Sequence, residues 1–242
     1  MTDPAATALP RAASGPAPVV VEALLVGRVA PLGVGVLSAI DKHRVDVPLA
    51  LGASGLQGDE QADRRHHGGD DKALHHVAAE HYAWWAGELP GVDARRWVPG
   101  AFGENLSTCG MTEHEVCVGD RYALGDAQVE VSQARQPCWK LNLRFDVADM
   151  ARRVQACRRT GWYYRVRREG VVAAGDTLRL LERPCPRWPL ARLLHYLYVD
   201  PLDRAALAEI AALEPLAASW RQLARRRLDS GRVEDWARRL DG

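Results

Sequence analysis

The chain has 242 residues, 47% of them hydrophobic, and a formal net charge of +1. The apolar content is enough for a sizeable core, which excludes a largely disordered chain. The balanced charge provides no global field toward nucleic acid or an anionic membrane, so we expect no nucleic-acid partner and only a local anion site.

Targeting and redox features favour a cytoplasmic protein with no membrane association. No run approaches the roughly 20 apolar residues of a membrane span. The first 20 residues lack the apolar core of a secretory signal. The five cysteines are an odd number without a C-x-x-C pair, so we expect reduced thiols and no disulfide framework.

The first third of the chain predicts a tail, two strands and a helix. Residues 1–17 are rich in Ala, Pro, Ser and Thr and predict a flexible tail. The segments 19–30 and 43–51 are β-branched or alternate in polarity, as strands do. Apolar side chains then repeat at helical spacing over residues 74–87, and Asp70 or Asp71 is available as N-cap.

Short alternating runs that meet at Gly-Asp turns dominate the middle of the chain. They predict strands at 115–120, 121–126, 127–132, 162–167, 171–176 and 177–182, with one helix over 146–159. So many short strands favour a closed or strongly coiled sheet, because closure removes exposed edges. After residue 186 the pattern is helical, broken by Asp-Pro, Glu-Pro and Ser-Gly, which predicts a small helical domain.

Residues 55–73, GLQGDEQADRRHHGGDDKA, form the first candidate site. Its paired glycines leave backbone N–H groups open to a ligand, and the helix expected near Asp71 would present a partially positive end. Arg, His and Lys side chains surround that point, which suggests an anion cradle. A solvated polar loop explains the same pattern equally well.

Two further stretches carry candidate groups. Asn105, in FGENLSTCG, offers a donor and an acceptor to a heterocycle, although Asn in such turns usually serves the backbone. Cys138, in SQARQPCWKL, has Arg135 and Lys140 beside it, which would activate a thiolate as nucleophile or metal ligand. A buried inert thiol is the commoner fate of a lone cysteine.

The histidines at 66, 67, 75, 76 and 81 raise the question of zinc. The H-E-x-x-H pattern is missing, and three histidines of one helix cannot all face one ion. A zinc site is therefore the weaker interpretation.

Taken together, these stretches resemble the MOSC domain family, the molybdenum-cofactor sulfurase C-terminal type, and closely its YiiM-like branch. The resemblance rests on residues 55–73, EHYAWW, AFGENLSTCGMTE, VSQARQPCWKLNLRF and the Gly161-Trp162 pair, in that order. It covers about residues 19 to 240. It implies an α+β, mainly β fold, in which residues 18–185 form a MOSC-type β-barrel with peripheral helices and residues 186–242 form a C-terminal three-helix domain.

The resemblance also implies a molybdenum cofactor (molybdopterin) whose metal is coordinated by Cys138. It implies reduction of N-hydroxylated small molecules such as hydroxylamino base analogues, a detoxification, with electrons from a separate flavin-containing reductase. The residues expected to bind the cofactor are Ser38, Lys42, Arg64, Arg65, His67, Gly68, Gly69, Lys72, Asn105 and Lys140. Asp71 and His67 are expected to donate protons. The branch commonly carries proline where this chain has Asp70.

Two other functions are compatible with the same residues. Cys138 as a persulfide would make the protein a sulfur carrier, and a pocket without turnover would store or ferry the cofactor. No G-x-G-x-x-G fingerprint occurs, which favours electron delivery by a partner. We expect the helical domain to dock that partner or to form a homodimer contact.

Overall fold

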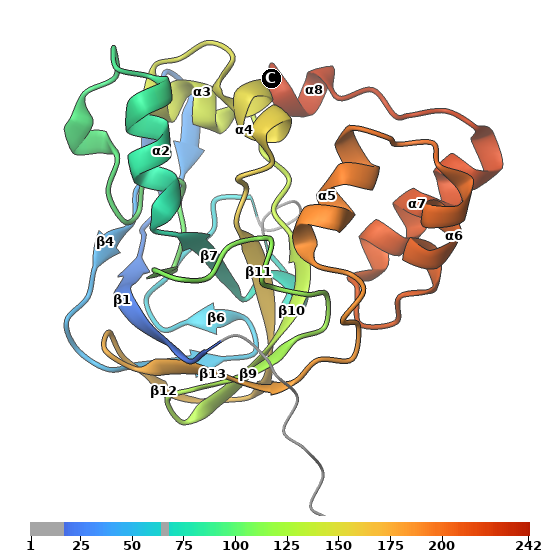
Figure 1. Ribbon diagram of the computed structural model, residues 1–242. Helices are drawn as coiled ribbons and strands as arrows, with labels where there is room; N and C mark the ends of the chain where they lie inside the picture. Colours follow the sequence, from blue (N-terminus) through green and yellow to red (C-terminus); the bar gives the residue numbers. More distant parts are fainter. Residues whose placement is uncertain (1–16, 64–67) are drawn as a thin grey trace, which may run out of the picture.

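The computed structural model describes residues 17–63 and 68–242 (Figure 1). Among these residues, seven strands follow the order β13-β9-β10-β11-β7-β8-β1, and pairing of β1 with β13 closes them into a barrel. All neighbours are antiparallel except β7 and β8. The strands are β1 (Val19–Val26), β7 (Leu74–Ala78), β8 (Leu106–Thr108), β9 (Arg121–Leu124), β10 (Ala127–Ala134), β11 (Trp162–Arg168) and β13 (Thr177–Glu182). The expected mainly β, closed sheet is confirmed.

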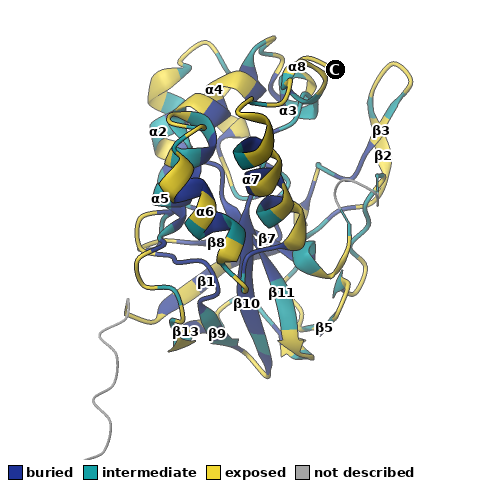
Figure 2. Ribbon diagram, turned by 90° about the vertical axis from the view of Figure 1, so that its right-hand side faces the viewer, coloured by how far each residue is buried: buried dark blue, intermediate teal, exposed yellow. Residues whose placement is uncertain are grey.

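Shorter strands decorate the barrel. They are β2 (Ala30–Gly33), β3 (Val36–Ser38), β4 (His43–Arg44), β5 (Leu49–Gly52), β6 (Gly55–Leu56) and β12 (Gly170–Val172). β4 extends the sheet beside β1, and β12, β5 and β6 form a separate small sheet. The β2–β3 hairpin projects from the body of the molecule (Figure 2).

Helices cover one end and one side of the barrel. They are α2 (Glu80–Glu88), α3 (Lys140–Phe145), α4 (Met150–Cys157), α5 (Leu190–Tyr198), α6 (Arg204–Ala212), α7 (Ala218–Ser230) and α8 (Ala237–Leu240), with 3-10 helices at Asp70–Lys72 and Ala94–Arg96. α5, α6 and α7 stand together beside the barrel, whereas α8 lies with α3 and α4 (Figure 1). In the described part of the chain, no helix is long and apolar enough to cross a membrane.

The helix expected over residues 74–87 is wrong in its first half. A 3-10 turn at Asp70–Lys72 leads directly into strand β7, and the helix α2 begins only at Glu80. All five residues of β7 are buried, between β11 and β8. A fully buried strand shows no alternation, so periodicity alone cannot separate it from a buried helix. The helix end expected near Asp71 is therefore absent, and with it the dipole argument for an anion cradle.

Three other expected elements differ in the structure. The single strand over 43–51 is two, β4 and β5, and Val47 between them is 59% exposed. Residues 115–120 contribute only an isolated bridge at Cys117. The helix over 146–159 begins at Met150, because Asp146 adopts a left-handed conformation with φ 56° and ends α3.

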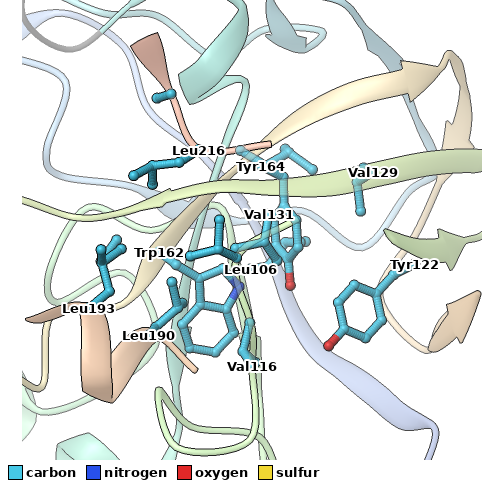
Figure 3. Close-up of a cluster of buried hydrophobic side chains, with 14 of the residues drawn as sticks. Leu106, Val116, Tyr122, Val129, Val131, Trp162, Tyr164, Leu190, Leu193 and Leu216 are labelled. Carbon is cyan, nitrogen blue, oxygen red and sulfur yellow. The ribbon is translucent and has the colours of Figure 1, made fainter. Parts of the chain in front are cut away.

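The main core continues from the barrel into the helical domain. Figure 3 shows Leu190 and Leu193 of α5 beside Val131 and Trp162 of the barrel. Burial of such apolar side chains contributes about 1.5–3 kcal/mol each. A second core, which includes Trp85, lies under α2, α3 and α4. The barrel and helical domain therefore pack as one body.

His76 of β7 makes the fold sensitive to acid. Its ring nitrogens lie 3.0 Å from the Tyr164 hydroxyl and 2.9 Å from the Thr108 hydroxyl, and burial lowers its pKa to about 3. The unfolded chain binds a proton near pH 6.5 and the folded chain does not, so stability falls as pH drops below 6.5.

We predict that this histidine alone costs about 2 kcal/mol of unfolding free energy between pH 7 and pH 5. In His76→Gln, urea unfolding followed by circular dichroism should show a smaller loss over this range. His43→Gln, on an exposed side chain, should keep the wild-type slope. Equal slopes in all three proteins would contradict the assignment.

Candidate functional site

One pocket collects most of the polar groups singled out in the sequence. The pocket is open to solvent, and its volume, including the open part, is about 600 Å³. Its described lining contains four cationic and three acidic side chains, with one histidine, one tyrosine and one thiol among the other groups. These are Lys42, Lys72, Arg135, Lys140, Asp59, Glu60, Asp63, His75, Tyr163 and Cys138. The pocket is thus a mixed polar site with a slight excess of positive charge.

A buried ion pair forms the base of the pocket. Lys42 Nζ donates to both carboxylate oxygens of Asp59, and the two side chains are only 7% and 3% exposed. The Asp59 carboxylate also accepts from the Gly27 backbone N–H at 2.8 Å. Burial lowers the pKa of Lys42, and the charge of Asp59 opposes that shift. Removal of either partner would leave a buried charge uncompensated, which typically costs several kcal/mol.

Asn105 joins this pair to the barrel. Its Nδ2 donates to Asp59 Oδ2 at 2.9 Å and to the Leu25 carbonyl at 3.1 Å. Its Oδ1 accepts from the His75 backbone N–H at 3.1 Å. The amide therefore has a partner for both N–H groups and for its oxygen. Asn105 lines the pocket but acts first as a cross-link between β1, β7 and the Asp59 loop.

The loop before Asn105 is held by a buried carboxylate. Glu104 accepts hydrogen bonds from the backbone N–H groups of Gly100, at 2.6 Å, and Phe102, at 2.9 Å. The Tyr82 hydroxyl donates to it as well. Burial raises the pKa of Glu104, and these bonds oppose the shift. The carboxylate of Glu104 in the FGEN motif thus fixes the loop that forms one wall of the pocket.

Cys138 lies where strand β10 gives way to α3. Pro137 has no N–H to continue a strand ladder, so the chain turns out of the barrel there. The Arg135 N–H still donates to the Gly161 carbonyl at 3.0 Å. Gly161 has φ 70°, and a Cβ on it would lie 2.2 Å from the His76 carbonyl oxygen, which explains the glycine of the Gly161-Trp162 pair.

Among the described residues, nine buried side-chain atoms have no hydrogen-bond partner, and two of these nine lie on residues of the pocket lining. These two are His75 Nε2 and Arg135 Nη1, on side chains whose residues are 3% and 4% exposed. Burial lowers the pKa of His75 well below its usual value, and the charge of Arg135 acts in the same direction. Unpaired buried polar groups are costly. Their place in the pocket leaves both atoms available to a bound molecule.

The structure brings together six of the nine sequence-predicted site residues that it describes. Ser38, Lys42, Lys72, Asn105, Cys138 and Lys140 all line the pocket. The Ser38 hydroxyl accepts from the Ile40 N–H at 3.2 Å, and Lys140 Nζ donates to the Leu37 carbonyl at 2.9 Å.

Other predicted residues lie elsewhere or outside the description. The carboxylate of Asp71 accepts from Arg165 at 2.7 Å, and neither Asp71 nor Gly68 nor Gly69 lines the pocket. Arg64, Arg65 and His67 fall in the segment 64–67, outside the described residues. Among residues 17–63 and 68–242, no three His, Cys, Asp or Glu side chains form a metal-binding group.

Sequence reasoning missed several pocket groups as site residues, among them Asp59, His75 and Tyr163. Asp59 lies inside the quoted Gly-rich stretch and His75 two residues after it, but the helix expected near Asp71 favoured Asp71 as the site residue. Tyr163 gave no signal, because in the sequence it belongs to an ordinary apolar strand. Its residue is 9% exposed, and burial raises the pKa of its hydroxyl.

This arrangement can bind a polar molecule beside a thiol. The Cys138 side chain is only half-buried, so a molecule in the pocket can reach its sulfur. A thiolate is a soft ligand, and thiophilic metals prefer it to the hard oxygen ligands of other side chains. The unpaired Arg135 and His75 atoms supply directional hydrogen bonding next to it.

Comparison with known proteins agrees with this architecture. The MOSC domain model matches residues 63–179, and the model of the YiiM-like 3-alpha helix domain matches residues 188–231. Protein YiiM from Escherichia coli is 40% identical over 216 residues, which cover 89% of this chain and 96% of that protein.

A second relative and a solved structure extend the comparison. A protein named reductase from Gibberella moniliformis is 38% identical over 200 residues, which are 82% of this chain but 35% of that protein. The crystal structure of YiiM from Escherichia coli superposes with a TM-score of 0.80 at 35% identity, over 94% of this chain and all of that one. With a closed barrel, a thiol-bearing pocket and a three-helix unit in the same order, the chain belongs to the MOSC family and, within it, to the YiiM-like proteins.

Proposed function

We propose that this protein is a molybdenum-cofactor-dependent oxidoreductase that reduces N-hydroxylated compounds. One observation carries the proposal: the Cys138 thiol shares its pocket with two buried, unpaired polar atoms, Arg135 Nη1 and His75 Nε2. MOSC domains are associated with the molybdenum cofactor, and the relative named reductase favours redox chemistry.

The donor set fits such a cofactor. Cys138 would coordinate the metal, and Arg135 would bond the pterin or its phosphate, because a guanidinium presents a rigid set of donors. Lys140, Lys72 and Ser38 would complete the cradle, and Arg64, Arg65 and His67 stay predicted cofactor ligands outside the described residues. Asn105 and the Lys42–Asp59 pair would shape its base and need not touch the cofactor, since their polar atoms already pair with one another.

When bound, the cofactor would supply two-electron redox chemistry. In the overall reaction the N–O bond breaks, two electrons and two protons are consumed, and the products are an N–H compound and water. The task of the chain is to orient the N–OH group and to deliver protons.

Lys72 is a suitable side chain for proton delivery. Burial lowers its pKa from the usual lysine value, with Asp71 and Asp63 opposing the shift. A lysine ammonium with a reduced pKa donates a proton more readily near neutral pH. Asp71 and His67 remain predicted proton donors. If Asp71 takes part, it acts through Lys72, because its own carboxylate is paired with Arg165.

Electrons would come from a separate flavin-containing reductase. We propose that this reductase docks near the pocket or on the helical domain. The alternative role of the helical domain is a homodimer contact. We also propose that the protein works in the cytoplasm.

We predict near-stoichiometric molybdenum and pterin in wild-type protein purified anaerobically from a host that makes the cofactor. Cys138→Ser should retain the fold but lose the metal and the N-hydroxyl reduction, since a serine hydroxyl replaces the thiolate ligand. Elemental analysis and pterin fluorescence after oxidative release measure both components.

Cys157→Ser is the matched control. Its thiol donates to the Val154 carbonyl, outside the pocket, so metal and activity should be unchanged. Equal metal in wild type and Cys138→Ser would refute the assignment. Pterin without molybdenum would indicate a cofactor carrier, and a persulfide on Cys138 would indicate sulfur transfer.

We predict that Arg135→Met separates binding from stability. Methionine fills similar space and removes an unpaired buried atom, so the free energy of unfolding should change by no more than about 1 kcal/mol. Cofactor affinity should fall about 10- to 100-fold, because a charged hydrogen bond is lost. Arg179→Met, on an exposed side chain of β13, is the control in both titrations. An Arg135→Met protein that keeps wild-type affinity would contradict this role.

A further inference from the structure

The last part of the chain, beyond α7, lies outside both matched family ranges, which end at residue 231. It nevertheless leaves the helical domain along a fixed path. Arg227, only 2% exposed, donates to Glu234 at 3.0 and 2.7 Å and to the Leu197 carbonyl at 3.1 Å. Trp236 then packs edge-on against Tyr198 of α5 at 5.7 Å. The segment is therefore anchored before it reaches α8.

Arg239 of α8 contacts the peptide groups on both sides of Cys138. Its Nη1 donates to the Pro137 carbonyl at 2.6 Å, and its own carbonyl accepts from the Trp139 N–H at 2.8 Å. Its Nη2 donates to Gln155 Oε1 of α4 at 2.6 Å. One arginine thus joins the cysteine loop, α4 and α8.

Neighbours of Arg239 strengthen this attachment. The Leu240 carbonyl accepts from Asn142 Nδ2 of α3 at 2.9 Å, and the Leu240 side chain is buried. Asp241 pairs with Arg152 of α4 at 2.6 Å. Figure 1 shows α8 beside α4, above α5, α6 and α7. The segment is a strap from the helical domain to the Cys138 loop.

We propose that Arg239 is a positioning residue for Cys138, and that residues 234–242 are the strap through which the helical domain holds the thiol at the pocket. The peptide groups beside Cys138 have left the barrel ladder, so they need other partners. The planar guanidinium can bond the Pro137 carbonyl and Gln155 together, which a single ammonium cannot do equally well. That Arg239 positions a metal ligand rests on the proposed function. The contacts of Arg239 with the Cys138 loop do not depend on it.

The test measures the Cys138 thiol in metal-free protein. Iodoacetamide alkylation is followed residue by residue by peptide mass spectrometry, in wild type, Arg239→Gln, Arg239→Lys and Arg238→Gln. Arg238 is the matched control, because it is the adjacent arginine of α8 and is exposed. Cys109, an exposed thiol that donates to Glu80, provides an internal reference in every sample.

We expect Arg239→Gln to raise the alkylation rate of Cys138 about tenfold, because a loosened loop opens the half-buried thiol more often. Arg239→Lys should restore part of the protection through the Pro137 bond alone, and Arg238→Gln should match wild type. Hydrogen exchange at the Trp139 amide should rise in a protein that ends at residue 235. The Cys109 rate should stay constant throughout.

Unchanged Cys138 rates in Arg239→Gln would overturn the proposal, as would an equal rise at Cys109, which would reflect general loosening. Because alkylation needs no metal, this result is independent of the molybdenum content of Cys138→Ser. A failure of the strap and a failure of the proposed function are therefore distinguishable.

Discussion

The carboxylate of Asp59 holds the pocket together. It accepts from Lys42, from the Asn105 amide and from the Gly27 backbone, so it connects the end of β1, the loop before β8 and the Gly-rich stretch. At 3% side-chain exposure, such a charge is tolerated only because every partner is in place. A hydrogen-bonded network of this kind is rigid. Because the base of the pocket is rigid, the side chains of the other wall can be selected for binding a ligand.

The pocket therefore has two kinds of polar group. Asn105 and Asp59 are saturated by partners within the chain and serve its architecture. His75 and Arg135 each keep a buried atom without a partner. A folded chain carries few such atoms, since each costs about 1–3 kcal/mol. Within the pocket, the difference in saturation separates groups that hold the fold from groups that are available to a bound molecule.

The sequence was informative where spacing reflects a local rule and uninformative where it depends on tertiary contacts. Gly-Asp turns marked most barrel strands correctly, and the breakers after residue 186 marked the helices. β7 was misread because full burial removes the alternation by which strands are recognised. Because of this error, Asp71 was predicted as a site residue and His75 was not. In the structure, His75 of β7 lines the pocket, whereas Asp71 pairs with Arg165.

Contacts between distant segments explain what no motif could predict. Residues 104 and 105 read as a turn, yet their side chains tie the turn to Tyr82, Leu25 and Asp59. No motif marks Arg239, yet it lies 102 residues from the carbonyl that it bonds. The entropy cost of closing the loop between such segments rises only slowly with loop length. Once a shared core has brought distant segments near, the additional free-energy cost of pairing them is therefore small. The core that runs from the barrel into α5 provides that proximity, and the helical domain can thus act on a cysteine that lies in the other half of the fold.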